Sequence, residues 1–213
     1  MPFSFVLPDT VFPSTSYKKL GSIKYYLKAK MHTKSQGFMD SAKKAFSGGF
    51  KTTQPLHIRG TLDNATLSSL NVETKFRESK TFTFSRSSGP LSMHGKIPRA
   101  IAVPGEFLPI KTHVKNDSGK RVSGVRATLI EHCKFTAKSH GETASASKKA
   151  VLQKFERTFD SEITGGQALD DVMVELLVPQ DAEPSLKGKL FSRHHRVSVC
   201  LYFVSLVLII LPG

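Results

Sequence analysis

Two sets of lysines are the residues of this chain best suited to binding chemistry. In the run from Gly21 to Met31, apolar residues alternate with lysines. Successive side chains of a strand point to opposite faces, so these lysines are expected to share one face. An ammonium group attracts carboxylates, phosphates and anionic lipid headgroups, so both sets predict anion or partner binding. The candidate residues are Lys24, Lys28, Lys30, Lys148, Lys149 and Lys154.

The overall charge also favours acidic partners, but surface lysines have a second explanation in solubility. The chain has 213 residues and a formal net charge of +14, which favours acidic partners such as phosphorylated tails, anionic lipids or nucleic acid. The lysines are scattered in runs no longer than two, and exposed sheet faces and edges also use lysine to stay soluble. Nucleic acid is not expected as a partner, because no aromatic stacking platform is evident.

Catalytic and metal-binding patterns are not expected in this chain. None of the histidines stands at a ligand spacing with a carboxylate, and His132 and Cys133 are adjacent and so face opposite sides of a strand. Neither a nucleophile elbow nor a phosphate-binding glycine loop is present. Glu106 follows a turn and is expected to bond local backbone amides. The sequence therefore predicts no catalytic residue, no metal, no cofactor and no enzymatic activity.

The cysteines indicate the compartment. Cys133 and Cys200 are far apart and both lie in apolar, strand-like runs, so they form neither a disulfide framework nor a metal site. A reducing compartment follows. The segment Met1 to Leu7 has neither the basic region nor the long apolar stretch of a secretory signal peptide, which also favours the cytoplasm.

The segment from Gly89 to Leu129 has the clearest strand and turn pattern. A tight turn at Val103–Glu106 precedes a run in which apolar and polar residues alternate, as in a half-buried strand. Proline presets φ for such a turn, and glycine tolerates positive φ. The run Asn116–Gly119 breaks the alternation and is predicted to close a hairpin. The residues expected to build these turns are Pro104, Gly105, Glu106 and Asn116.

Similar patterns recur along the chain and predict its fold class. We count roughly ten strand-like runs, and no segment keeps a helical period over a dozen residues. Antiparallel β-sandwiches are the all-β architecture that fits. Residues 32–50, 62–70 and 138–147 are expected to be loops. Within the first of them, a short helix at residues 39–46 is the alternative. The polar run at 85–90 carries Gly and Pro and predicts a linker.

At this point three stretches resemble the arrestin family, in particular the arrestin-domain-containing proteins. The first extends from Phe5 to Ala29, contains FVLP, PSTSY and GSIKYYLKA, and looks like the second half of the family's amino-terminal domain. The second is Gly89 to Leu129, with its PGE turn and NDS hairpin, and resembles the start of the carboxy-terminal domain. The third is LLVP from Leu176, followed by Pro184 and Ser185, and is similar to a later strand and proline loop.

The resemblance implies both a fold and a role. The fold is two immunoglobulin-like antiparallel β-sandwiches, a partial amino-terminal domain at 1–84 and a carboxy-terminal domain at 91–213, joined by the 85–90 linker. Family members are cytoplasmic adaptors in protein transport, endocytosis and signalling, peripheral at the plasma membrane or endosomes. They bind receptor or transporter tails and often a ubiquitin ligase. An anionic lipid surface is a further expected partner, because of the lysines and the net charge.

Two departures from the family pattern affect these expectations. The family has several strands before the Phe-x-Leu-Pro segment, so the first sandwich is expected to be incomplete. Family tails often carry a Pro-Pro-x-Tyr motif that recruits ubiquitin-ligase WW domains, and this sequence has no Pro-Pro pair.

The apolar run from Val197 to Gly213 has three interpretations. Seventeen residues without a charge are at the lower limit for a membrane span, and the basic residues before them suit a tail anchor. The alternation from Val197 to Ser205 also fits a sandwich strand, and an aberrant reading frame is the third interpretation. A tail-anchored protein and a partial gene product are thus alternatives to the adaptor. The residues of the membrane interpretation are Val197, Leu201, Phe203, Leu206, Leu208 and Ile210.

Overall fold

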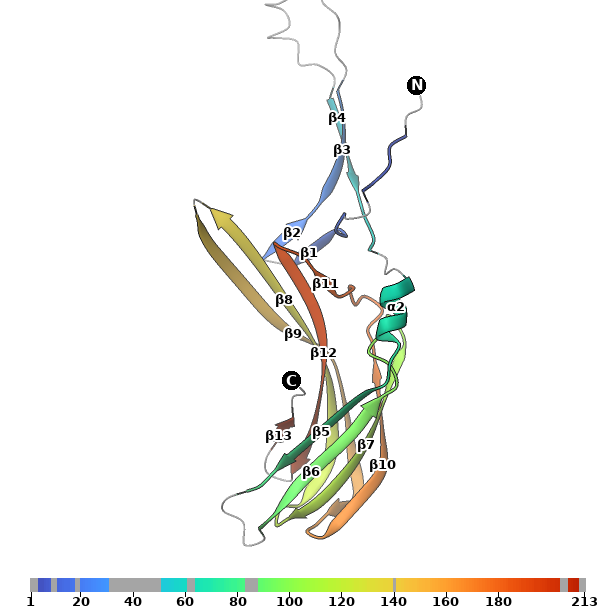
Figure 1. The fold of residues 1–213 in the computed structure, drawn as a ribbon, viewed down its shortest axis with the longest axis vertical. Helices are drawn as coiled ribbons and strands as arrows, with labels where there is room; N and C mark the ends of the chain where they lie inside the picture. The colour runs from blue at the N-terminus through green and yellow to red at the C-terminus, as the bar shows by residue number, and fades with distance from the viewer. Residues whose placement is uncertain are drawn as a thin grey trace, which may run out of the picture. The chain divides into compact units, whose positions relative to one another are not determined.

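The chain forms two compact units made almost entirely of antiparallel strands. The units are Met1–Thr61 and Leu62–Gly213, and Figure 1 shows their elements in a computed structural model. The structure describes residues 4–8, 11–17, 20–30, 51–60, 64–82, 88–139, 141–203 and 207–210. The helix suggested at residues 39–46 lies outside these ranges. The all-β prediction is confirmed.

The first unit contains two short hairpin-like sheets. Strand β1 (Thr15–Tyr17) pairs with β2 (Gly21–Ile23), and β3 (Tyr25–Lys30) pairs with β4 (Lys51–Leu56). The backbone N–H of Ser14 donates to the carbonyl of Ile58 at 2.8 Å, and the Ile58 N–H donates to Ser14 Oγ at 3.0 Å. These two bonds tie the segment just before β1 to the segment that follows β4.

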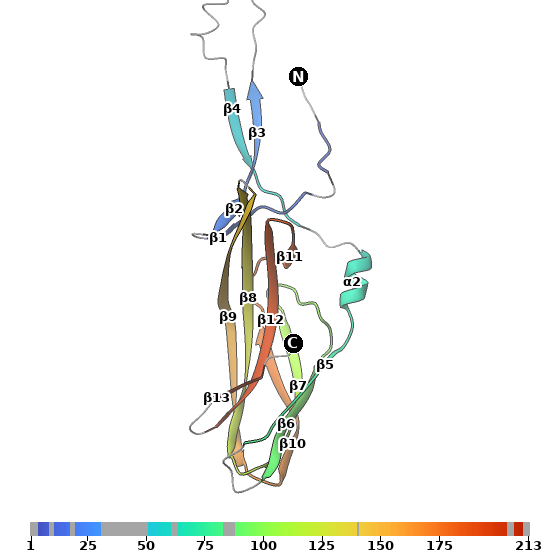
Figure 2. The ribbon, with the colours of Figure 1, turned by 60° about the vertical axis from the view of Figure 1, so that its left-hand side comes forward.

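The second unit is a sandwich of two antiparallel sheets. One sheet has the order β10-β7-β6-β5, and the other has the order β11-β12-β8-β9 with β13 added on β12. Figures 1 and 2 show β8 and β9 continuing together beyond the end of the other sheet. The strands of this unit are β5 (Thr74–Lys80), β6 (Ser88–Ile97), β7 (Phe107–Ser118), β8 (Val122–Ser139), β9 (Glu142–Ile163), β10 (Gln167–Leu177), β11 (Leu186–Lys187), β12 (Phe191–Phe203) and β13 (Val207–Ile210).

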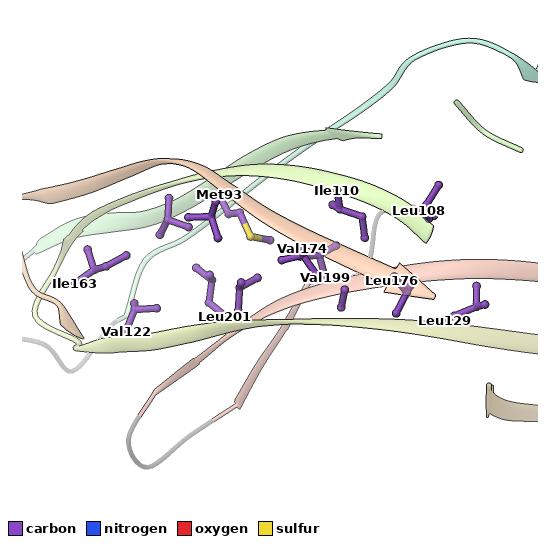
Figure 3. Packing of buried hydrophobic residues seen from close by; sticks show 14 of the residues in the cluster. Met93, Leu108, Ile110, Val122, Leu129, Ile163, Val174, Leu176, Val199 and Leu201 are labelled. Atoms are coloured by element: carbon purple, nitrogen blue, oxygen red, sulfur yellow. The ribbon is translucent and has the colours of Figure 1, made fainter. Parts of the chain in front are cut away.

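The core of the sandwich follows from the period-two pattern of its strands. In β7, each second residue from Leu108 to Ser118 is buried, and β10 buries Val172, Val174 and Leu176 against it. Figure 3 shows Ile110, Val174 and Leu176 facing Val199 and Leu201 of the other sheet. Each fully buried aliphatic side chain stabilises the fold by about 1.5–3 kcal/mol. The apolar face, rather than any helix, holds the unit together.

Residues 64–70 form the helix α2 (Asn64–Leu70), where the sequence predicted a loop. The polar residues taken there as loop punctuation also favour helix starts. The helix ends with the Asn71 N–H donating to the Leu67 carbonyl at 3.1 Å, and the Leu70 carbonyl accepts from the Ala100 N–H at 2.9 Å. This last bond is long-range, so the helix depends on a contact that local sequence does not reveal.

The boundary between the units lies earlier than the linker predicted at residues 85–90. Contacts separate the chain between Thr61 and Leu62. The reason is that β5 pairs with β6 along its whole length, from Thr74 opposite Ile97 to Lys80 opposite Leu91. The segment expected to end the first domain therefore forms an edge strand of the second unit.

The predicted turn before β7 is confirmed. Gly105 has φ of 86°, which a residue with a Cβ adopts only with strain, and its N–H donates to the Val178 carbonyl at 2.8 Å. The Val178 N–H donates back to the Glu106 carbonyl at 2.8 Å. As expected, the Glu106 carboxylate accepts from a local amide, the Val103 N–H at 3.1 Å, and it also pairs with Arg99. Pro104 precedes the glycine in this turn.

Two predicted turns lie elsewhere than expected. Asn116 belongs to β7, which continues to Ser118, so the hairpin turn comes after it. The loop predicted at residues 138–147 is instead mostly strand, because β8 runs to Ser139 and β9 begins at Glu142. Gly141 lies between them with φ of 86°. Where the structure describes them, the polar side chains of both runs are exposed or bond within the sheet, so they do not end the strands.

The apolar carboxy-terminal run forms strands in the described residues. Leu201 in β12 is fully buried, and Val197 and Phe203 pack against the same core, as the strand interpretation predicted. Leu208 pairs with Leu201 and Ile210 with Val199 through β13. Leu206 lies outside the described residues. No helix in the described part of the chain is long and apolar enough to cross a membrane.

Candidate partner-binding surface

The first set of predicted lysines is exposed on the first unit. Lys24 lies between β2 and β3, and Lys28 and Lys30 lie in β3, while Ile23, Tyr25 and Leu27 are half-buried. The predicted alternation therefore holds from residue 23 to 28. The register adds a cation that the sequence did not reveal, because Lys51 of β4 is paired with Lys30.

The second set lies on β9 but does not share one face. Lys149 pairs with His132 and Lys154 with Thr128, so both lie on the face of the even-numbered residues of β8. Lys148 pairs with Cys133 and lies on the other face. In an unbroken strand Lys148 and Lys154 would share a face. A bulge between the pairs of Leu129 and Ile130 inverts this relation, and the sequence carries no sign of it.

The face that carries Lys149 and Lys154 is the outward face of the β8–β9–β12 sheet, and we call it the basic outer face. It is defined by residues on three neighbouring strands: Ile130, His132, Lys134, Lys149, Val151, Lys154, His194 and Arg196. On this face, the described residues from Thr128 to Lys134 of β8 lie beside the residues paired with them on β9 and β12. None of these residues is acidic. Lower on the same face, Arg126 Nε lies 2.6 Å from Glu156 Oε1.

A histidine pair lies at the centre of the basic outer face. His132 Nδ1 is 3.0 Å from His194 Nε2, and the rings meet edge to face with centroids 4.6 Å apart. Burial lowers the pKa of His132, and the nearby charges of His194, Lys149 and Lys134 lower it further. The two residues are 62 positions apart in the chain. Only the pairing of β8 with β12 brings them together, so sequence reasoning could not find them.

The opposite face of the same strands holds a buried polar cluster. Arg193 is 2% exposed, its Nε lies 2.9 Å from Glu131 Oε2, and it also pairs with Glu183. Ser185 Oγ lies 2.9 Å from His195 Nδ1. This cluster ties the segment that follows β10 to β8 and β12. It is a structural attachment, because its ion pairs and hydrogen bonds join the protein's own side chains.

Neither cysteine is placed for nucleophilic chemistry. Cys133 and Cys200 are buried and unpaired as disulfides. Burial raises the pKa of the Cys133 thiol and of the Cys200 thiol, so both stay protonated and unreactive near neutral pH. Within the described residues, no group of three His, Cys, Asp or Glu side chains could hold a metal ion. What the surface can do chemically is bind carboxylates or other anions.

Comparison with known families matches most of this unit. The family model of the arrestin (or S-antigen) C-terminal domain matches residues 87–211, which is more than half of the chain. The match begins just before β6 and ends after β13, so it includes the turn at Gly105, the buried Asn116 and all three strands of the basic outer face. The chain therefore belongs to the arrestin family.

Proposed function

We propose that this protein is a non-enzymatic, arrestin-like adaptor that binds acidic cytoplasmic tails of membrane receptors or transporters and takes part in their endocytosis and transport. The observation that carries the proposal is the basic outer face on an arrestin C-terminal domain. Lys149, Lys154 and the His132–His194 pair lie together there, and among the described residues the acidic one that adjoins Lys154 on this face, Glu156, is paired with Arg126. Family membership supplies the adaptor role, and the charge supplies the kind of partner.

Electrostatics favours tails that carry carboxylates or phosphates. Exposed lysines attract such groups over about a Debye length, or about 8 Å at physiological salt, and so raise the encounter rate. The exposed Lys24, Lys28 and Lys30 of the first unit offer a second cationic surface. The protein would act from the cytoplasmic side, peripheral to the plasma membrane or endosomes, with anionic lipid as an additional contact.

Ubiquitin-ligase machinery is a further proposed partner. The 213 residues contain no Pro-Pro pair, so a WW domain would not bind them through a Pro-Pro-x-Tyr motif.

Quantitative surface proteomics in cells that express the chain tests the proposed function. The wild type should lower the surface level of a subset of receptors or transporters, measured by surface biotinylation and mass spectrometry. The variant Lys149→Glu with Lys154→Glu should lose this effect, while Arg77→Glu with Lys80→Glu should keep it. The control pair lies exposed on β5 of the other sheet and changes the net charge equally.

A separate variant, Lys24→Glu with Lys28→Glu and Lys30→Glu, reports on the first unit. An unchanged surface proteome with the wild type would contradict the adaptor function. An unchanged effect in every charge-reversal variant would contradict the basic surfaces as its binding sites.

A further inference from the structure

We propose that the outer edge of β9 binds an extended, acidic segment of a partner protein as an additional strand of the sheet. The inference rests on the proposed adaptor function and names how a partner is held. The occupant is a segment of a partner protein that pairs its backbone with β9. On the face that carries the lysines, this segment has acidic residues on either side of an apolar one.

The first support is that β9 is an edge strand. It is the last strand in the order β11-β12-β8-β9, and its only ladder in the described residues is with β8. Residues 142–149 of this 22-residue strand are all exposed. In a strand paired on one side, part of the backbone N–H and C=O groups point away from the partner and can pair with another strand.

The part of β9 whose outer edge is available for pairing is its amino-terminal part. Near the other end of β9, Arg157 Nη1 donates to the Met173 carbonyl of β10 at 2.8 Å. That end therefore lies against the sheet that contains β10. Residues 143–147 are Thr, Ala, Ser, Ala and Ser, whose small side chains let another backbone approach closely. The stretch from Thr143 to Phe155 is long enough for a strand of typical length.

The second support is the order of side chains along the edge. Lys149, Val151 and Lys154 lie on the basic outer face, because they pair with His132, Ile130 and Thr128. Val151 is 57% exposed, which leaves an apolar residue between two cations. A strand laid beside them would place its own alternate residues opposite this series. Carboxylate, apolar and carboxylate residues at alternate positions are the complementary sequence.

The third support is that the charge disfavours other occupants. Between Thr143 and Phe155 the edge carries three lysines and no acidic residue, so a second β9 would bring like charges together. Lysines on an edge commonly prevent such self-association, yet they attract an acidic strand. By contrast, the edge strand β10 carries Asp170, Asp171 and Glu175 without a basic residue, and so would repel the same segment.

Fluorescence anisotropy with the purified full chain tests the inference. The probe is a labelled twelve-residue peptide of three Glu-Ser-Val-Ser repeats, which places Glu and Val in turn on one face of a strand, and its partner probe is the same peptide N-methylated at every residue. Methylation removes the amide donors and keeps the charge. We expect the parent peptide to bind and the methylated peptide to bind at least tenfold more weakly. Equal binding of both peptides would mean attraction by charge alone and would overturn strand addition.

Variants of the chain test the position. Lys149→Glu with Lys154→Glu should weaken binding of the parent peptide roughly tenfold, and Arg77→Glu with Lys80→Glu should leave it unchanged. Hydrogen exchange should show new protection in residues 142–155 when the peptide is bound, and none in β5. Protection elsewhere, or equal affinity in both variants, would overturn the assignment to β9.

Two further readouts separate the alternatives. If sedimentation shows a dimer that Lys149→Glu with Lys154→Glu dissociates, the occupant is a second copy and the inference is wrong. Peptide binding without any effect of the wild type on the surface proteome would refute the adaptor function alone. A surface effect that survives both reversals on β9 would refute the inference alone.

Discussion

Asn116 shows how much one buried polar side chain contributes to this fold. Its Nδ2 donates to the carbonyls of Lys120 and Ile163 at 2.7 and 2.8 Å, and its Oδ1 accepts from the Ser118 N–H at 3.0 Å and the Ser118 hydroxyl at 2.6 Å. The side chain is fully buried. It thus joins β7, the following turn and the end of β9.

Replacement Asn116→Ala should destabilise the second unit by about 3 kcal/mol, because two carbonyls and an N–H would lose their partner away from water. Urea unfolding followed by far-UV circular dichroism measures this, since the chain has no tryptophan. The matched control is Asn71→Ala, at an exposed asparagine. We expect Asn71→Ala to lower the free energy of unfolding by less than about 1 kcal/mol. An equally small effect of Asn116→Ala would contradict the structural role of Asn116.

His195 predicts a pH dependence of stability. Burial lowers its pKa, and the charges of Arg193 and His194 lower it further, against the opposite effect of Glu131. An unfolded histidine takes up a proton at a pH of about 6.5. Below that value the unfolded chain binds more protons than the folded chain, so the free energy of unfolding falls as pH decreases from about 6.5 towards the folded pKa.

His195→Asn should therefore reduce the difference in unfolding free energy between pH 7.5 and 5.5, because asparagine can still bond Ser185 and does not titrate. Some dependence should remain, since the pKa values of His113 and His132 are also lowered. His57→Asn, at an exposed histidine of the first unit, is the control for the substitution itself. An equal slope in wild type and His195→Asn would refute the assignment.

At the scale of elements, two glycines of the second unit are needed for different reasons. One lies where neighbouring strands pack closely, and the other lies in a turn with positive φ. A Cβ on Gly95 would lie 2.4 Å from the Lys111 carbonyl oxygen and 2.5 Å from Phe76 Cζ. A Cβ on Gly141 would meet nothing within 4 Å, although its φ is 86°. The first glycine is required by packing between β5, β6 and β7, and the second by backbone conformation alone.

Gly95→Ala should cost about 2–3 kcal/mol of stability, because backbone atoms would have to shift. Gly141→Ala should cost about 1 kcal/mol, the strain of a left-handed residue with a Cβ. Thermal unfolding of the two variants side by side measures the difference. The packing account would be wrong if Gly141→Ala proved the more damaging change.

The sequence predicts the elements whose pattern is local, and fails where distant contacts decide. The alternation from Leu108 to Val114 and the turn at Gly105 are visible in the sequence, because each depends on neighbouring residues. Helix α2 depends on a bond from Ala100 to Leu70, and the face of Lys154 depends on a bulge. Similarly, the His132–His194 pair exists only through the register of β8 and β12. These features depend on contacts between residues far apart in the sequence, so they could be found only from the structure.

At the scale of the whole molecule, the second unit has a hydrophobic core of its own. The residues of its core cluster, and those packed against that cluster, all lie between Phe76 and Phe203. The first unit has two small sheets of its own, with bonds between Ser14 and Ile58. Both units carry exposed lysines, such as Lys28 on β3 and Lys149 on β9.

A fragment of residues 62–213 should therefore unfold cooperatively, with a free energy of unfolding close to that of the same unit in the whole chain. Denaturant unfolding by circular dichroism, combined with limited proteolysis of the full chain near residue 61, measures this. Replacement Leu201→Ala, in the core, serves as a destabilised reference and should lower stability by about 2–5 kcal/mol. A fragment without a cooperative transition would contradict an independent second unit.

The central claim is that an arrestin C-terminal domain here holds acidic tails of membrane proteins along β9. The most direct measurement places a photo-cross-linking amino acid at Val151 of the full chain in living cells and identifies the cross-linked peptides by mass spectrometry. The matched site is Val103, which is similarly exposed at 59% against 57% but lies in the turn before β7. We predict that Val151, and not Val103, cross-links to acidic cytoplasmic segments of receptors or transporters. Cross-links from Val151 only to other copies of this chain, or the same partners from both sites, would contradict the claim.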